Sequence, residues 1–397
     1  MFEHFQQYAG DPILSLQQTY AQDARTDKVN LSIGLYYDAE GRIPRLASVR
    51  QAETALYGQD RPCVYLPMSG APEYRGAVEE LLFGADNPVL RAGKVATIQT
   101  VGGSGAVKVG SDVLRRYFPD SEAWICDPTW DNHVAIFEGS GFTVRRYPYF
   151  DPATRGVDFA GMMACLSRLP ARAIVLMHPC CHNPTGADLT RAQWDEAIAL
   201  LKERRLIPFL DSAYQGLGDG VEADAYAVRA MAQAGLSFLV SHSFSKTFSL
   251  YNERCGALSI VCQDADEAAR ALGQMEQAVR RNYSSPPAWG EVLVSRVLRD
   301  PVLKPLWLSE VEEMRQRIVA MRRRLHDVLL AALPGRDFSF LLSQRGMFSY
   351  TGLSAEKVRQ LREQSGIYLV DSGRLCVTGL NAGNVERVGN ALAKVLA

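Results

Sequence analysis

The stretch Leu206-Ile207-Pro208-Phe209-Leu210-Asp211-Ser212-Ala213-Tyr214 decides the fold, because an apolar run ends abruptly at an aspartate. An apolar run without polar alternation predicts a strand that is buried on both faces of a sheet. The same order recurs along the chain, with each apolar run followed by a polar or glycine-bearing turn and then mostly by a helical pattern. The other runs are residues 95–101, 123–126, 173–177 and 238–240.

This alternation of apolar runs and helical segments predicts a mainly parallel α/β sheet. In such sheets ligands bind beyond the carboxyl ends of the strands. Each polar cluster directly follows a predicted strand, so we expect the clusters to converge on one site. Residues 308–333 read as a charged helix, and a further helix is expected from Ala355. This last part predicts a smaller α+β domain, which the first residues of the chain join.

Composition excludes several classes of function. The chain has 397 residues, 47% hydrophobic and 22% charged, with a net charge of -1, so no basic field favours nucleic acid or an anionic membrane. No apolar run approaches the ~18 residues of a membrane-spanning helix. Residues 1–8 have no apolar signal core, so we expect a cytoplasmic protein.

The cysteines predict neither a disulfide framework nor a metal site. Eight cysteines lie at irregular spacing without a CxxC pair, and the six histidines have no ligand-like spacing. His178, Cys180, Cys181 and His182 crowd together in sequence. We expect buried cysteines that pack as small hydrophobic residues beside a functional loop.

Two polar clusters suit a phosphate. Gly102-Gly103-Ser104-Gly105 follows an apolar run, and glycines there allow backbone N–H groups to approach an anion at a helix start. This signal is weak alone, since glycine-rich turns between strand and helix are common. Ser243-Phe244-Ser245-Lys246 with Arg254 is stronger, because two hydroxyls and a guanidinium suit a phosphate beside a reactive amine. The alternative for Lys246 alone is a solvated lysine in a surface loop.

Asp211 adds the third part of the pattern. An aspartate at the end of a buried strand is costly unless it faces a cation, and a protonated pyridine nitrogen is such a partner. The alternative is a helix N-cap, a common role for aspartate. Asn183, within Asn183-Pro184-Thr185-Gly186, could likewise serve only as a turn residue.

The combined order of these motifs resembles the class I aminotransferases, which have the pyridoxal-phosphate fold type I. The similarity runs from Asn30-Leu31-Ser32-Ile33-Gly34 to Asp371-Ser372-Gly373-Arg374. Tyr251-Asn252-Glu253-Arg254 and the stretch from Arg280 to Pro287 look like the aspartate and aromatic branch. The resemblance implies a large domain with a mainly parallel seven-stranded sheet flanked by helices, and a smaller α+β domain. The implied boundaries are an N-terminal arm at 1–12, the small domain at 13–44 and 312–397, and the large pyridoxal-phosphate domain at 45–311.

The resemblance also implies roles for matching residues. Lys246 would hold the cofactor as a Schiff base and carry the substrate's α-proton, while Asp211 would pair with the pyridinium nitrogen. Tyr214 and Asn183 would hydrogen-bond the cofactor's phenolic oxygen, and Trp130 would stack on the cofactor ring. Phosphate would be bound by Gly103, Ser104, Ser243, Ser245, Arg254 and a neighbouring subunit's Tyr65. His133 and His178 match positions near the cofactor, either as supports of the site or as ordinary structural histidines. Substrate carboxylates would be bound by Arg374, near Gly34, Trp130 and Asn183, and by Arg280 from the second subunit of a homodimer.

Small differences favour the aromatic branch. The residues that look like that branch are Leu35-Tyr36-Tyr37, Ile43, Ser104 and Ser284-Ser285. A bulkier apolar lining of the substrate site would favour an aromatic ring. With Arg280 retained, we expect tyrosine and phenylalanine as donors, 2-oxoglutarate as acceptor, and aspartate and glutamate as additional substrates. Two alternatives stay open: an aspartate aminotransferase, and, more remotely, a non-catalytic pyridoxal-phosphate regulator.

Overall fold

A computed structural model describes residues 1–7, 10–60 and 62–397; Tyr8, Ala9 and Arg61 lie outside the described residues. The chain forms two compact units. The large unit contains Pro44–Arg317 with Gln344–Gly346, and the small unit contains Met1–Ile43, Ile318–Ser343 and Met347–Ala397. The predicted domain boundaries, with a separate arm at residues 1–12, stay a prediction.

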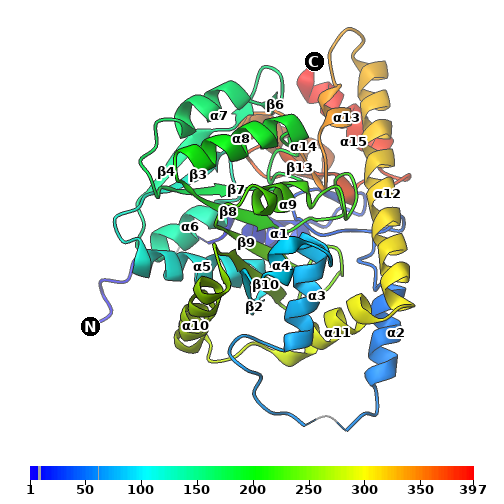
Figure 1. The fold of residues 1–397 in the computed structure, drawn as a ribbon. Helices are drawn as coiled ribbons and strands as arrows, with labels where there is room; N and C mark the ends of the chain where they lie inside the picture. The colour runs from blue at the N-terminus through cyan, green and yellow to red at the C-terminus, as the bar shows by residue number, and fades with distance from the viewer. Residues whose placement is uncertain (8–9, 61) are drawn as a thin grey trace. The chain divides into compact units, whose positions relative to one another are not determined.

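The large unit is built on a seven-stranded sheet (Figure 1). The four pairs among β9, β8, β7, β3 and β4 are parallel, whereas β10 lies antiparallel between β2 and β9. In spatial order the strands are β2 (Val95–Val101), β10 (Cys255–Val261), β9 (Phe238–Ser243), β8 (Ile207–Ser212), β7 (Ile174–Met177), β3 (Ala123–Asp127) and β4 (Val144–Pro148).

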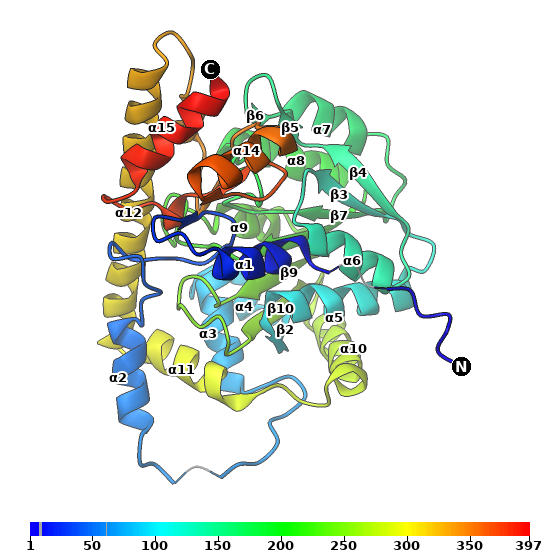
Figure 2. The same ribbon diagram turned by 180° about the vertical axis from the view of Figure 1, so that it is seen from behind.

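Helices cover both faces of this sheet, as the opposite views of Figures 1 and 2 show. One face packs on α5 (Gly102–Tyr117), α6 (Asp131–Gly139) and α10 (Ala265–Asn282), whose buried side chains share one core with the strands. The other face is covered by α3 (Pro72–Phe83), α8 (Arg191–Glu203) and α9 (Tyr226–Gln233). Burial on both faces explains why the central strands read as continuous apolar runs.

The large unit has further short elements around the sheet. They are α2 (Ala47–Leu56), α4 (Pro88–Arg91), β5 (Phe150–Asp151), β6 (Gly156–Val157), α7 (Phe159–Leu166), α11 (Ala288–Arg299) and the first half of α12 (Leu303–Ala332).

The small unit contains the second half of α12 and several short elements. Two two-stranded sheets pair β1 with β12 and β11 with β13. The elements are α1 (Pro12–Gln22), β1 (Val29–Asn30), α13 (Phe340–Ser343), β11 (Phe348–Tyr350), α14 (Ala355–Ser365), β12 (Ile367–Tyr368), β13 (Arg374–Cys376), the 3-10 helix η1 (Val377–Gly379) and α15 (Val385–Leu396).

The predicted α/β class and the seven-stranded, mainly parallel sheet are confirmed. All five apolar runs are strands, but β4 and β10 were not among them. The helix after β2 begins at Gly102 rather than after Gly105, and α12 begins at Leu303 rather than near residue 308. None of the helices in the described part of the chain is long and apolar enough to cross a membrane.

Candidate active site

The predicted polar clusters follow neighbouring strands of the large unit. Asp211 lies near the end of β8 beside Ser241 of β9, its direct partner in the parallel register. Ser243 ends β9, and the Lys246 turn follows it. Gly102 starts α5 directly after β2. The sheet therefore brings these segments to one edge although they are far apart in sequence.

Asp211 is held by hydrogen bonds at both carboxylate oxygens. His133 Nε2 lies 2.8 Å from Oδ2, and Ser241 donates to Oδ1 at 2.6 Å. His133 comes from α6, and its other ring nitrogen lies 2.9 Å from Thr129 Oγ1. Asp211 is buried in the last residues of a strand. The N-cap alternative for Asp211 is therefore wrong.

The environment keeps Asp211 ionised. Burial alone raises its pKa, but the hydrogen bond and positive potential of His133, with the Ser241 hydroxyl, hold the pKa of Asp211 below its ordinary value. Burial has the opposite effect on the neighbouring His178, lowering its pKa to about 3. A buried, negatively charged carboxylate is costly without an opposite charge, so Asp211 is suited to a cationic partner.

Lys246 lies between two tyrosines. Its Nζ is 5.9 Å from the ring centroid of Tyr214 and 5.1 Å from that of Tyr251. Asn183 Nδ2 donates to the Tyr214 hydroxyl at 3.4 Å, so Asn183 does more than form a turn. Lys246 is half-buried. The alternative of a solvated surface lysine is therefore wrong.

A second group of donors gathers beside Lys246. Arg254 Nη1 donates to Ser245 Oγ at 3.3 Å and to the Tyr251 carbonyl at 3.1 Å. The hydroxyls of Ser243 and Ser245 lie 3.2 Å apart. A guanidinium with two hydroxyls is a donor set that suits a phosphate dianion.

Glycine is required at the start of α5. Gly102 has a φ of +66°, and a Cβ there would lie 2.5 Å from Arg254 Nη2. At Gly103 a Cβ would lie 3.1 Å from Ser243 Cβ. The bare backbone therefore lets the guanidinium and the serines approach the first turn of α5, where no side chain caps the helix. Ser104 lies half-buried in the same turn.

The donor sets match the group that the sequence predicts. Arg254, Ser243, Ser245 and the N-terminus of α5 suit a phosphate, and Asp211 suits a protonated ring nitrogen. Trp130, directly before α6, contacts the His133 ring edge-on with centroids 5.1 Å apart. An amine, an anion and a phosphate cradle thus occur together in one unit.

Several buried groups could also ligate a metal, although the sequence predicts none. The three groups are Cys126, His178 and His182; His133, His178 and Asp211; and Cys180, Cys181 and Asp224. Burial raises the pKa of the Cys126 thiol to about 12, so the thiol stays protonated. His182 already contacts Cys126 Sγ at 3.1 Å and Thr185 Oγ1 at 2.8 Å. All eight cysteines are free, as expected, and the absence of a metal stays a prediction.

The family model for class I and II aminotransferases matches residues 26–392. The chain belongs to this family. The aminotransferase is 60% identical over 397 residues to the aromatic-amino-acid aminotransferase of Escherichia coli (strain K12), and the match covers 100% of both chains. It is 50% identical over 386 residues to an aspartate aminotransferase of Pseudomonas aeruginosa, covering 97% of each chain.

Solved structures agree with this assignment. An aromatic-amino-acid aminotransferase from Burkholderia pseudomallei, covalently bound to pyridoxal phosphate, superimposes with a TM-score of 0.98 at 49% identity, covering 100% of both chains. The predicted membership of the aminotransferase family, with its aromatic and aspartate relatives, is confirmed.

The small unit of this aminotransferase holds Arg374 and Gly34. Arg374 is buried at the start of β13, where its Nη2 donates to the Ser32 carbonyl at 2.7 Å. Its guanidinium lies 4.5 Å from the ring centroid of Phe348, on the paired strand β11. A buried guanidinium held in one orientation suits recognition of a carboxylate. The binding of the substrate carboxylate by Arg374, with Gly34 expected nearby, stays a prediction.

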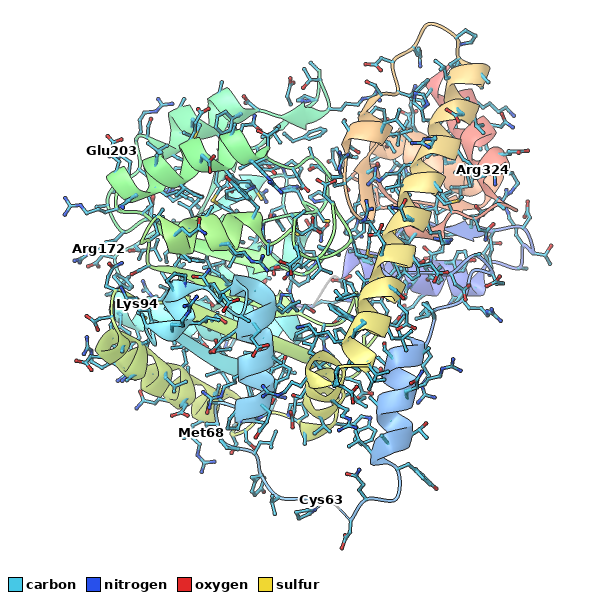
Figure 3. The ribbon with its side chains drawn as sticks, turned by 45° about the vertical axis from the view of Figure 1, so that its right-hand side comes forward. Cys63, Met68, Lys94, Arg172, Glu203 and Arg324 are labelled. Atoms are coloured by element: carbon cyan, nitrogen blue, oxygen red, sulfur yellow. The ribbon has the colours of Figure 1, made fainter. Side chains whose placement is uncertain are left out.

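Two predicted site residues lie outside the cluster built around Asp211. Tyr65 is 90% exposed, on the connection between α2 and α3 that carries Cys63 and Met68 in Figure 3. Arg280 is exposed near the end of α10, where it donates to Ser284 of its own chain. Both residues were predicted to act in a neighbouring subunit, which the single chain does not test.

Three residues of the site had no predicted role. Ser241 and Thr129 support Asp211 and His133, and Tyr251 lies against Lys246. Ser241 carries a detectable signal, because a polar residue inside an apolar strand needs a buried partner. Tyr251 stood out in the sequence only as part of a longer motif.

Proposed function

We propose that this aminotransferase transfers the amino group of tyrosine and phenylalanine to 2-oxoglutarate, giving the aromatic 2-oxo acid and L-glutamate, and that it also accepts aspartate. The cofactor is pyridoxal 5'-phosphate. The observation that carries the proposal is the gathering of Lys246, the ionised Asp211 and the Arg254–Ser245 donors in one unit. The aromatic preference is supported by the relative in Escherichia coli that shares 60% identity.

Bound pyridoxal phosphate supplies an aldehyde that bonds covalently to amines and a ring that withdraws electrons from the substrate's Cα–H bond. The Lys246 amine would hold the cofactor covalently through its aldehyde, and when free it could accept and return the proton of the substrate's Cα–H bond. Asp211 keeps the ring nitrogen protonated by offering it a negative charge. Tyr214 and Asn183 would hydrogen-bond the phenolic oxygen of the cofactor, and Trp130 would stack on its ring.

Binding of the phosphate and of the substrate falls to other residues. The phosphate would be bound by Gly103, Ser104, Ser243, Ser245 and Arg254. Tyr65 of a neighbouring subunit would be the remaining phosphate-binding residue. Arg374 would bind the α-carboxylate that all donors share, and Gly34, Trp130 and Asn183 are the other residues assigned to the substrate. A bidentate clamp at this carboxylate also orients the Cα–H bond for proton removal.

The proposed dual specificity and homodimer rest on the role assigned to Arg280. Dicarboxylates need a fixed cation for their second carboxylate, whereas an aromatic ring needs apolar surface and no cation. Because Arg280 is exposed and bonded to Ser284 in its own chain, we assign it to the site of a second copy. The cytoplasmic location stays a prediction from the sequence.

A preference for aspartate is the second candidate. The retained Arg280 and the 50% identical aspartate aminotransferase of Pseudomonas aeruginosa favour it. Both candidates use the same cofactor and the same Lys246, so only the relative efficiency of donors separates them.

A donor panel tests the proposal. The kcat/KM of the pyridoxal-phosphate-loaded enzyme is measured for tyrosine, phenylalanine and aspartate with 2-oxoglutarate as acceptor. We expect tyrosine and phenylalanine to exceed aspartate, which still reacts. A higher value for aspartate would support the second candidate, and no turnover of any donor would contradict both.

A further inference from the structure

Ser241 is a buried hydroxyl in the middle of a central strand. It has no exposed surface and lies in β9, next to β8 in the parallel register that pairs it with Asp211. Its Oγ lies 2.6 Å from Asp211 Oδ1. Charge-assisted O–H···O⁻ hydrogen bonds have lengths of about 2.5–2.7 Å. Since an ionised carboxylate has no proton to give, Ser241 is the donor.

This hydrogen bond does something that His133 cannot do alone. His133 holds only Oδ2, so a carboxylate with that single partner could turn about its last side-chain bond. Ser241 fixes the second oxygen from a different element, and the two donors together set the plane of the carboxylate. Each oxygen can accept more than one hydrogen bond, so a lone pair remains for a ring nitrogen.

Ser241 also acts on the proton affinity of Asp211. A donor stabilises the ionised form of a carboxylate more than its acid form. Loss of the donor makes the carboxylate a stronger base. A proton shared between Asp211 and a ring nitrogen then moves toward the carboxylate, and the ring loses positive charge.

We propose that Ser241 is a positioning residue for transamination: through its hydrogen bond to Oδ1, it orients Asp211 and keeps the proton on the cofactor's ring nitrogen. The proposal rests on the proposed function, because it needs pyridoxal phosphate beside Asp211. Ser241 has no exposed surface, so it acts through Asp211 rather than on the substrate.

The experiment compares Ser241→Ala with Ser241→Thr, which keeps a hydroxyl on a β-branched side chain suited to a strand. Ser259→Ala is the matched control, because Ser259 is equally buried in the neighbouring β10 but bonds Thr97 Oγ1 at 2.9 Å. All variants are loaded with 15N-labelled pyridoxal phosphate. The 15N chemical shift of the ring nitrogen is recorded against pH, together with kcat and KM.

In Ser241→Ala we expect the ring-nitrogen shift to move toward that of the unprotonated ring. A lost hydrogen bond to a charged group predicts a roughly tenfold lower kcat, with KM for the donor changed less than about twofold. Ser241→Thr restores both values, and Ser259→Ala changes neither. In an Asp211→Asn background, Ser241→Ala has no further effect on the shift, because the carboxylate through which it acts is gone.

An unchanged shift in Ser241→Ala, or the same change in Ser259→Ala, overturns the proposal. If Ser241→Ala does not fold, Ser241→Cys supplies the same test, with a weaker donor of similar shape. A wild-type chain that binds no pyridoxal phosphate contradicts the proposed function instead. A wild type that binds it and transaminates, beside an unaffected Ser241→Ala, contradicts only the role of Ser241.

Discussion

Two regions of the large unit differ in whether their predicted site residues are buried and bonded within one chain or exposed at its surface. Around Asp211, the cofactor cluster is buried, and its hydrogen bonds come from β8, β9 and α6 of the same chain. Tyr65 and Arg280 are exposed instead, and Arg280 donates to Ser284 close to its own helix end. This difference separates residues whose contacts lie within one chain from residues that are predicted to act in a second copy. The selection of the second carboxylate by Arg280 of a second copy stays a prediction.

Lys246→Ala breaks the cofactor cluster most severely. We expect no measurable transamination, because the variant lacks the amine that lies beside Tyr214 and Tyr251 and that is proposed to bond the cofactor. The matched control is Lys94→Ala. Lys94 directly precedes β2, at the end of the strand away from Gly102 (Figure 3). The control should keep wild-type kcat. Turnover by Lys246→Ala at even about one hundredth of the wild-type rate would remove Lys246 from its role.

Asp211→Ala should weaken cofactor binding and slow single-turnover proton abstraction on the order of a thousandfold for every donor. Without the carboxylate, the ring nitrogen loses its charge partner. Asp211→Asn keeps the shape and removes the charge, so it should be nearly as slow. Equal rates for Asp211→Asn and wild type would show that charge at this position is not needed.

Arg280→Leu should lower kcat/KM mainly for dicarboxylate substrates. Loss of a charge-assisted contact costs roughly 3–5 kcal/mol in transition-state binding for aspartate and 2-oxoglutarate. Phenylalanine, measured with an aromatic 2-oxo acid as acceptor, should lose far less. Equal losses for aspartate and phenylalanine would contradict the selective role.

Mixed dimers sharpen the same comparison. A Lys246→Ala chain combined with an Arg280→Leu chain contains one site with an intact Lys246 and an intact Arg280 from the other copy. Aspartate activity should therefore return in the mixture, although each variant alone lacks it. Failure to recover any activity in verified heterodimers would place Arg280 in its own chain's site.

The buried histidines predict a smaller effect on stability. Burial lowers the pKa of His178 to about 3, so His178 is neutral in the folded state but protonates near 6.5 when unfolded. The unfolded state therefore binds more protons between these values, and stability falls as pH falls through that window. His178→Asn should reduce the slope of the unfolding free energy between about pH 6.5 and 5 by up to about 1.4 kcal/mol per pH unit.

Urea unfolding of the apoprotein at several pH values measures this slope. His4→Asn is the control, because His4 is exposed in the folded chain and should leave the slope unchanged. His182 and His242, whose pKa values burial also lowers, keep part of the slope in the variant. A slope identical to wild type in His178→Asn would contradict the argument.

The sequence predicts, for a physical reason, that the polar clusters around Asp211 and Lys246 follow strands of one sheet. Apolar runs mark buried strands, and parallel strands end at one edge, so the sequence alone places Asp211 and Lys246 together. Strand β10 was missed because it runs antiparallel directly after Arg254, without the helical crossover that marks the others. Ser241 was missed because its partner depends on the register between β8 and β9, which no single segment encodes.

The roles of Tyr65 and Arg280 were predicted from resemblance alone. Neither residue has a local pattern that indicates a site, since an exposed arginine at a helix end is usually a solvated charge. Their assignment needs the geometry of a second copy.

Borohydride reduction of the pyridoxal-phosphate-loaded wild type, followed by peptide mass spectrometry, tests the central claim most directly. Reduction fixes the cofactor to the amine that holds it. We expect one phosphopyridoxyl group per chain, on the peptide that contains Lys246, and none on Lys94. Stoichiometric labelling of any other lysine, with Lys246 unmodified, would contradict the account.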